Sequence, residues 1–214
     1  MDEATKTILF YPELLKGYVK GKILDIGAGQ DPVTPGAVIF DKPHGNAENI
    51  LEHFERESFD TVFSSHCLEH INEPLLVIQD WFALVKPGGH LFVIVPDEDL
   101  YEQGHFPSIF NNDHKSTFTI SKSISWSSKS INVLDLAKLL SGNLVYLKEQ
   151  SDGYDHSMQT FSKLGLRKYR IGVFLLRFSL LKRIFLKLRL VALDQTSLNR
   201  PVLAQICMVI QKHQ

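Results

Sequence analysis

The 214-residue sequence has few cysteines and no long apolar run. Its two cysteines, Cys67 and Cys207, are too few and too far apart for a disulfide framework or a cysteine-based metal site. No uninterrupted apolar stretch is long enough to span a bilayer. The opening residues, MDEATKTILF, are acidic and lack the long apolar core of a signal peptide. These absences predict a protein of a reducing, cytoplasmic setting.

An excess of one charge and internal repetition are lacking too. The formal net charge of −1 excludes a globally basic nucleic-acid binder, although it leaves local patches open. The sequence contains no visible repeat or low-complexity segment. Hydrophobic residues make up 44% of a chain that is long enough to bury one core. We therefore expect a single domain over residues 1–214.

Short apolar runs rich in Val, Ile and Phe predict buried strands. They lie at residues 22–27, 37–41, 60–66, 90–97, 143–150 and 203–212. A helix is expected before the fourth run, because apolar residues recur at helical spacing at Leu75, Ile78, Phe82 and Val85. Its expected N-cap is Asn72 and its expected stop is Gly88-Gly89. A further amphipathic helix is expected over 132–142. Strand, helix and strand of these lengths predict an α/β protein with a Rossmann-like, mostly parallel sheet and helices on both faces.

Two segments depart from this alternation. Residues 98–130 are polar, aromatic and rich in serine, and they predict a long functional loop or lid. Residues 161–193 carry nine basic residues and no acidic one, and they predict a basic helical insertion before the last strand. Three interpretations of the insertion stay open. It is a lid or dimer element with a solvated charged face, an interfacial helix drawn to anionic lipid, or a surface for an anionic substrate such as a nucleotide-sugar, a lipid-linked glycan or RNA.

The stretch ILDIGAGQDP at residues 23–32 ends an apolar run in glycine, as a strand does where its backbone must approach a ligand. A phosphate-binding P-loop needs a Lys and a Ser or Thr after its last glycine, and neither follows here. A dinucleotide site would need a third glycine at the position of Pro32, which lacks an N–H and stiffens the turn. S-adenosylmethionine carries no phosphate, so it suits this loop: Asp25 can attract its amino group, and Asp41 can accept hydrogen bonds from both ribose hydroxyls.

Four motifs in order carry a family resemblance. They are DIGAG, the acid that ends the second strand, FDTVFSSHCLEHINEP, and VKPGGHLFVIVP. Together they resemble a class I S-adenosylmethionine-dependent methyltransferase, strongly over residues 20–97, which would form the cofactor-binding half. LEH followed by KPGG is the pattern of the branch that methylates small molecules and glycans. The resemblance implies S-adenosyl-L-methionine as cofactor and S-adenosyl-L-homocysteine as product.

The resemblance also implies a set of cofactor-binding residues. Loop residues would line the methionine and ribose, the acid of the second strand would hold the ribose, and the next two positions would lie beside adenine. The end of the following strand would face the methionine carboxylate or the sulfonium. These residues are Asp25, Gly27, Ala28, Gly29, Asp41, Asn46, Ala47, Ser64, Ser65 and His66. Two departures stand out: Asp31 replaces the usual third loop glycine, and the short distance from Asp41 to Asn46 predicts a sheet trimmed after its second strand.

Residues 104–119 follow the strand whose end faces the methyl donor, so they are positioned to cover the acceptor. A polar string from Asn111 to Lys115 lies there among aromatic residues. His114, with Asp113 beside it, is the candidate catalytic base, and the alternative is that the pair only fixes the loop. Glu69 and His70 either brace the helix that follows them or touch the ligand, and bracing is favoured for His70. No metal is expected, because no second cluster completes a zinc site around Cys67.

The sequence thus predicts transfer of a methyl group to a small molecule or a glycan sugar, with O-methylation favoured by His114. The alternatives are an inactive methyltransferase-like protein that binds the cofactor, an RNA methyltransferase that uses the basic insertion, and a nicotinamide-dependent oxidoreductase, which Pro32 disfavours. DNA is not an expected partner, because the strand ends in SSHC rather than in a base-gripping Asn/Asp-Pro-Pro-aromatic string. A homodimer is expected, as is peripheral contact of 161–193 with the inner face of an anionic membrane.

Overall fold

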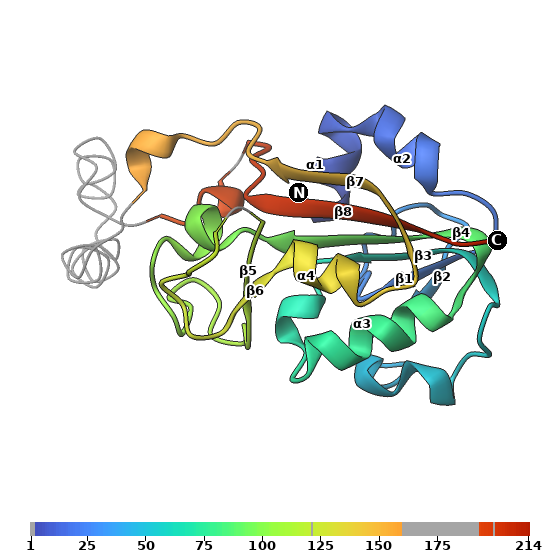
Figure 1. Ribbon diagram of the computed structural model, residues 1–214. Helices are drawn as coiled ribbons and strands as arrows, with labels where there is room; N and C mark the ends of the chain where they lie inside the picture. Colours follow the sequence, from blue (N-terminus) through green and yellow to red (C-terminus); the bar gives the residue numbers. More distant parts are fainter. Residues whose placement is uncertain (1–2, 121, 160–192, 199) are drawn as a thin grey trace.

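The computed structural model describes residues 3–120, 122–159, 193–198 and 200–214 (Figure 1). The basic insertion predicted over 161–193 therefore lies, apart from its last residue, outside the described residues. Within the described ranges, no helix is long and apolar enough to cross a membrane.

Six strands form one sheet in the order β2-β1-β3-β4-β8-β7. Their bounds are β1 (Ile23–Ile26), β2 (Val38–Phe40), β3 (Phe59–Ser65), β4 (Val85–Pro96), β7 (Gly142–Gln150) and β8 (Gln205–Lys212). The first four strands pair in parallel, while β8 runs antiparallel to both of its neighbours. Every predicted apolar run overlaps a strand, and the predicted α/β, Rossmann-like, mostly parallel sheet is confirmed.

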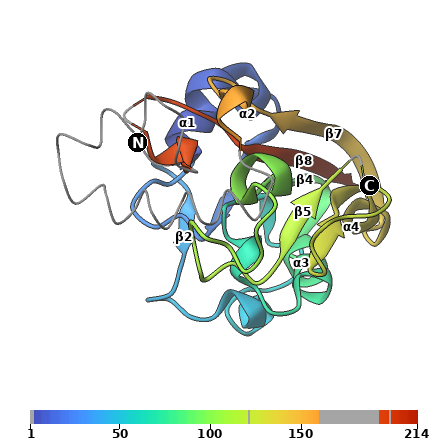
Figure 2. The same cartoon turned by 90° about the vertical axis from the view of Figure 1, so that its left-hand side faces the viewer.

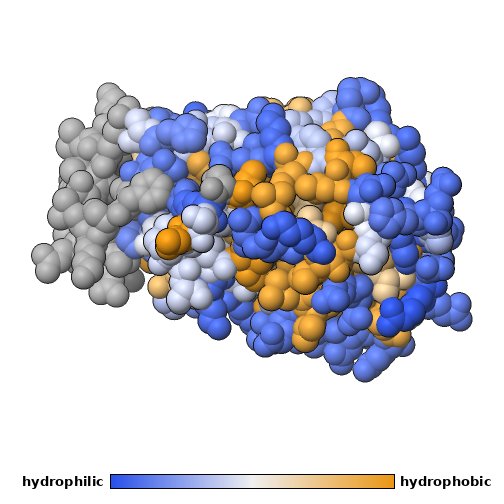
Figure 3. All heavy atoms as spheres, in the orientation of Figure 1, coloured by the Kyte–Doolittle hydropathy of each residue, from blue (hydrophilic) through white to orange (hydrophobic). Residues whose placement is uncertain are grey.

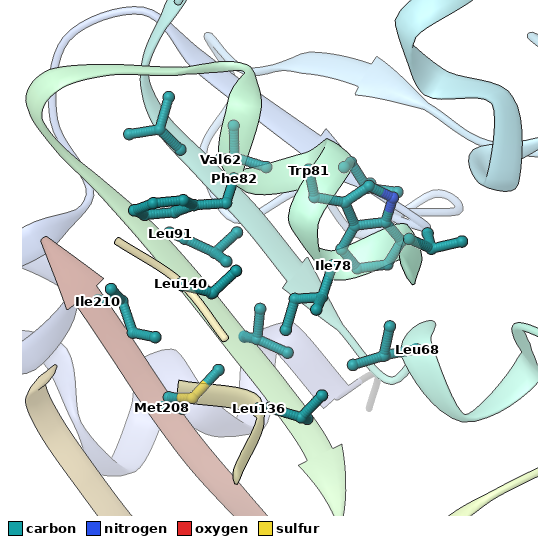
Figure 4. Close-up of a cluster of buried hydrophobic side chains, with 14 of the residues drawn as sticks. Val62, Leu68, Ile78, Trp81, Phe82, Leu91, Leu136, Leu140, Met208 and Ile210 are labelled. Atoms are coloured by element: carbon teal, nitrogen blue, oxygen red, sulfur yellow. The ribbon is translucent and has the colours of Figure 1, made fainter. Parts of the chain in front are cut away.

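Helices cover both faces of this sheet (Figure 1). On one face, α1 (Glu3–Phe10) and α2 (Pro12–Tyr18) pack through Ile8, Leu15 and neighbours onto Phe63 and Phe92. On the other face lie α3 (Pro74–Ala83) and α4 (Val133–Lys138). Figure 4 shows the larger core between these two helices and the sheet, where Trp81, Ile78, Leu91 and Met208 are almost fully buried.

The sheet is short on the β2 side, as the sequence predicted. Residues 41–58 are described throughout, and they contain the 3₁₀ helix η1 (Ala47–Glu52) but no strand, so β2 is an edge strand. The connection from β1 to β2 contains no helix at all in its fully described residues 27–37. Instead, the Asp31 carboxylate accepts hydrogen bonds from the backbone N–H and hydroxyl of Thr5, at 2.9 and 2.7 Å. The loop is thereby tied to α1.

Some predicted boundaries are wrong. α3 starts directly after Glu73, and Asn72 donates to Glu48 rather than capping the helix. Gly88-Gly89 lies inside β4, not at a helix end. Glycine is required at position 89 because a Cβ there would stand 2.5 Å from the Asp60 carbonyl oxygen of β3. Gly142 does not close a helix but starts β7.

The predicted loop at 98–130 has more structure than expected. It contains the one-turn π-helix η3 (Glu98–Glu102) and the strand β5 (Thr117–Thr119), which pairs in parallel with β6 (Ser130–Asn132). Figure 2 looks onto the edge of the sheet where the parallel strands end, and this segment lies in front of it. The segment is therefore placed to cover whatever binds at that edge.

Apolar surface gathers over the face where α4 and β7 lie in Figure 1, as Figure 3 shows. Leu139, just after α4, is 47% exposed, and Leu144 in β7 is 41% exposed. The homodimer expected from the sequence stays a prediction.

Candidate functional site

Three pockets meet at the edge of the sheet where the parallel strands end, and His66 lines all of them. Pocket A has a volume of about 740 Å³ and lies beside β2 and η1. Pocket B, of about 200 Å³, lies between the β1 loop and α1. Pocket C, of about 410 Å³, lies between α1, the LEH segment and the loop at 111–114. The shared residue makes the three pockets neighbours in one cleft.

Pocket A brings together five of the predicted residues, which are Gly27, Asp41, Asn46, Ala47 and His66. Asp41 accepts hydrogen bonds from the backbone N–H groups of Gly29 and Lys42, at 2.8 and 2.6 Å, so its carboxylate is fixed at the end of β2. Asn46 caps η1 by accepting from the Glu48 N–H. The Ala47 carbonyl accepts from Nε1 of Trp81 at 3.0 Å. α3 therefore holds the wall of pocket A through η1.

Pocket B is lined by Asp25, Gly27, Ala28 and Ser65 of the predicted set. Gly27 has φ +80°, and a Cβ there would stand 2.6 Å from the Cys67 Cβ, so only glycine fits this position. Asp25 is 1% exposed and accepts from the Val33 N–H at 2.7 Å. Burial, with the charges of Asp31 and Asp41, outweighs that hydrogen bond and raises the pKa of Asp25 to about 7.

Two of the predicted residues do not line these pockets. Ser64 is fully buried and donates to the Ile26 carbonyl at 3.0 Å, so its hydroxyl joins β3 to β1. Gly29 donates its N–H to Asp41 and acts on pocket A only through that carboxylate.

Pocket C contains His114, which is 6% exposed. Its Nδ1 lies 2.6 Å from Oε1 of Glu102, and its ring stacks on Tyr101 with a centroid distance of 5.2 Å. Asp113 does not pair with His114: its carboxylate lies at the rim of pocket A, 3.1 Å from Nδ1 of His70. Asp113 and His114 are adjacent in the sequence, but Asp113 contacts His70 whereas His114 contacts Glu102.

Glu69 lies at the centre of these groups. It is 1% exposed, and neither of its carboxylate oxygens accepts a hydrogen bond from any described residue. Burial opposes its charged form, but the interaction with His66 and the nearby His114 and His70 keep the pKa of Glu69 below its usual range. In return, Glu69 and Glu3 raise the pKa of His66 to about 9 against the opposing effect of burial. A buried negative charge and an imidazolium therefore adjoin where the pockets meet.

Sequence reasoning missed several members of this site. Glu102 and Tyr101 come from η3, and Glu3 and Lys6 from α1, all in segments without a motif. The bracing of α3 favoured for His70 is wrong, because its side chain, like that of Glu69, faces the histidine cluster and the loop at 111–114. The available signal was that acidic and histidine residues follow the ends of two neighbouring parallel strands, β3 and β4, which meet at one edge of a sheet.

Comparison with known proteins agrees with this geometry. A family model described as a methyltransferase domain matches residues 4–132, which is more than half of the chain. A search of curated protein sequences gave no match. Among solved structures, a putative methyltransferase from Bacillus halodurans is similar with a TM-score of 0.56 and 14% identity, over 95% of this chain and 98% of that one.

Two further structures have a similar fold. One is a SAM-dependent methyltransferase from Archaeoglobus fulgidus, with a TM-score of 0.53 and 13% identity over 97% of this chain and 93% of that one. The other is a putative sarcosine dimethylglycine methyltransferase from Galdieria sulphuraria, with a TM-score of 0.51 and 15% identity over 98% and 84%. At such identities the likeness concerns the fold, while the family match rests on the sequence. The chain therefore belongs to the methyltransferase-domain family and has the class I methyltransferase fold.

Proposed function

We propose that this protein transfers the methyl group of S-adenosylmethionine to a hydroxyl group of a small molecule or a sugar. The observation that carries the proposal is the meeting of the three pockets at His66. Pockets A and B hold most of the residues that the family pattern assigns to the cofactor, and pocket C opens beside them with a buried polar cluster. Such an arrangement serves a reaction that aligns a donor and an acceptor.

The cofactor is proposed to lie across pockets A and B. The ribose hydroxyls would donate to Asp41, which offers only acceptors, and the adenine would lie beside Asn46 and Ala47. The methionine would lie in pocket B, where its ammonium group would favour the charged form of Asp25. Its sulfonium would then stand near His66, the residue that pocket B shares with pocket C.

The acceptor is proposed to occupy pocket C, whose lining offers both donors and acceptors to a polyhydroxylated molecule. These residues include Lys6, Asn111, Asp194 and Thr196. The acceptor oxygen forms a bond to the methyl carbon while the carbon–sulfur bond breaks and its electron pair stays on sulfur. The hydroxyl proton must leave during this step. His114 is the proposed activating residue, because it is buried in the pocket and oriented by Glu102.

Binding of S-adenosylhomocysteine, measured by calorimetry, tests the cofactor site. Asp41→Ala is expected to weaken binding at least about 10-fold, because a charge-assisted hydrogen bond contributes roughly 1.5–3 kcal/mol. Asp135→Asn, an exposed change on α4 that breaks a pair with Lys138, is the control and should bind as the unchanged protein does. Absence of S-adenosylhomocysteine binding by the unchanged protein would overturn the proposal.

Labelled S-adenosylmethionine with extracts of the native cell tests the transfer. We expect label in a small molecule or glycan, and loss of that label in His114→Ala with S-adenosylhomocysteine binding retained. Cofactor binding without any labelled acceptor would instead favour the inactive binding protein that the sequence left as an alternative.

A further inference from the structure

The three histidines around Glu69 share one arrangement. In His114, Nδ1 lies 2.6 Å from a carboxylate oxygen of Glu102, and in His70 it lies 3.3 Å from the backbone carbonyl oxygen of Asp113 and 3.1 Å from the carboxylate of that residue. In both rings Nε2 is the nitrogen that faces Glu69, at 3.9 and 4.0 Å from its Oε1. An oxygen that accepts from Nδ1 fixes the proton there, so Nε2 of the neutral ring presents a lone pair toward Glu69.

His66 follows the same pattern with its nitrogens exchanged. Its Nε2 lies 3.1 Å from Oε1 of Gln205, and that amide is oriented because its Nε2 donates to Thr7 and to Gln150. Gln205 therefore offers an oxygen to the Nε2–H of His66, and Nδ1, which carries the second proton of the imidazolium, faces Glu69 at 3.5 Å. Three imidazole nitrogens and a carboxylate oxygen with no hydrogen bond from any described residue thus converge on one buried spot.

We propose that Glu69, His70 and His114 bind a divalent transition-metal ion such as Zn²⁺. One donor atom of each residue lies within 4.8 Å of the other two. Donor atoms around a tetrahedral ion with bonds of 2.0–2.2 Å stand about 3.4 Å apart, so binding must draw each histidine about half an ångström closer to Glu69 and the widest pair of donor atoms together by up to about 1.4 Å. Two imidazoles and a carboxylate suit Zn²⁺, Fe²⁺ or Mn²⁺, whereas Mg²⁺ and Ca²⁺ prefer oxygen ligands alone.

The surroundings of the three groups have the features of a metal site. Asp113, through its backbone carbonyl and nearby carboxylate, and Glu102, through its carboxylate, hold the distal nitrogens of the two ligand histidines, as carboxylates and backbone carbonyls commonly do around protein-bound metals. Glu69 is 1% exposed, and neither of its carboxylate oxygens accepts a hydrogen bond from a described residue, although the His66 imidazolium lies beside it with Nδ1 3.5 Å from Oε1. The sequence did not predict a metal here, because the cluster joins the LEH segment to a residue 44 positions beyond His70.

The role of the ion in catalysis rests on the proposed function, in which His114 would act as a metal ligand. Pocket C is lined by Glu69, His70 and His114, so an ion bound by them faces the acceptor. An acceptor hydroxyl that binds the ion loses its proton more readily, and that proton passes to water. The oxygen then uses its electron pair to form the bond to the methyl carbon as the carbon–sulfur bond breaks. His114 acts as a ligand in this step rather than as a base.

Titration with Co²⁺ after treatment with a chelator tests the ion site without any acceptor. We expect one equivalent to bind the full chain with the visible absorption of imidazole-bound Co²⁺, Zn²⁺ to displace it, and excess Mg²⁺ to leave it unchanged. Glu69→Gln and His114→Gln should each weaken Co²⁺ binding at least about 10-fold, the range seen when a metal site loses a supporting group. His156→Gln changes an exposed histidine away from these pockets and should bind as the unchanged protein does.

The result that overturns the site is the absence of stoichiometric Co²⁺ binding, or equal binding in Glu69→Gln and the unchanged protein. The buried carboxylate would then be balanced by the His66 imidazolium alone. Calorimetry with S-adenosylhomocysteine on the same variants shows that they are folded and keeps the two proposals separate. Cofactor binding without Co²⁺ binding refutes only the ion, whereas Co²⁺ binding without cofactor binding refutes only the methyl transfer.

Discussion

At the scale of single residues, Asp25 is a buried carboxylate whose raised pKa makes the stability of the fold depend on pH. It is buried behind the glycine loop with one backbone hydrogen bond, and its pKa rises from an ordinary value of 3.8 to about 7. Between pH 4 and 7 the folded chain therefore keeps a proton that the unfolded chain has already released. Unfolding then releases that proton, so the free energy of unfolding falls as pH rises through this window and levels off above it.

We expect Asp25→Asn to remove this part of the pH dependence. The amide oxygen can still accept from the Val33 N–H, and the change in slope should approach 1.4 kcal/mol per pH unit at most, by a rough estimate. Urea denaturation at pH 5 and pH 7.5 measures it. Asp97, whose pKa burial also raises to about 7, titrates in both proteins and cancels in the comparison. Parallel curves for Asp25→Asn and the unchanged protein would contradict the expectation.

At the scale of secondary-structure elements, η1 depends on α3. Trp81 is fully buried in α3, and its Nε1 donates to the Ala47 carbonyl in the wall of pocket A. Trp81→Phe is expected to destabilise the fold by about 1–3 kcal/mol through the unpaired carbonyl and the space left behind. Cofactor binding should weaken as well, because Ala47 lines pocket A. Denaturation and calorimetry with S-adenosylhomocysteine measure the two effects.

Trp126→Phe is the matched control for this change. Trp126 is 38% exposed, and its Nε1 donates to Asp99. Its replacement should cost less than about 1 kcal/mol and leave cofactor binding unchanged. Equal effects of the two substitutions on cofactor binding would show that η1 does not need α3.

The elements also show how far sequence reasoning reaches. The strands were predictable because burial on both faces of a sheet leaves continuous apolar runs, as in residues 22–27 and 90–97. The glycine loop and Asp41 were predictable because both directly follow their strands. The cluster of Glu69, Glu102 and His114 was not, because η3 and the loop at 111–114 bring ordinary polar residues from separate segments together. The ends of α3 were misplaced because tertiary contacts of Asn72 and Gly89 outweighed their local preferences.

At the scale of the whole molecule, the family match ends at residue 132 but the core does not. β8 lies in the sheet between β4 and β7, and its Ile206, Met208 and Ile210 are no more than 1% exposed. A chain that stops at residue 132 would expose the edge and apolar side chains of β4 that β8 covers.

We therefore expect the chain that stops at residue 132 to lack a cooperative thermal transition when followed by circular dichroism. A chain without His213 and Gln214 should unfold as the full chain does, because both residues lie beyond β8 and are exposed. A cooperative transition in the shorter chain would show that the strands up to β4 form a domain alone.

Two segments far apart in the sequence close pocket C together. Lys6 of α1 donates to the Thr196 carbonyl at 2.8 Å, and both residues line that pocket. The end of β8 lies at the opposite edge of the molecule, near Gly88, where Figure 1 marks the C-terminus. For laboratory work, an affinity tag joined to Gln214 lies away from pocket C, whereas one joined just before Glu3 stands beside it. Apparent loss of activity in an N-terminally tagged preparation would then reflect where the tag was attached.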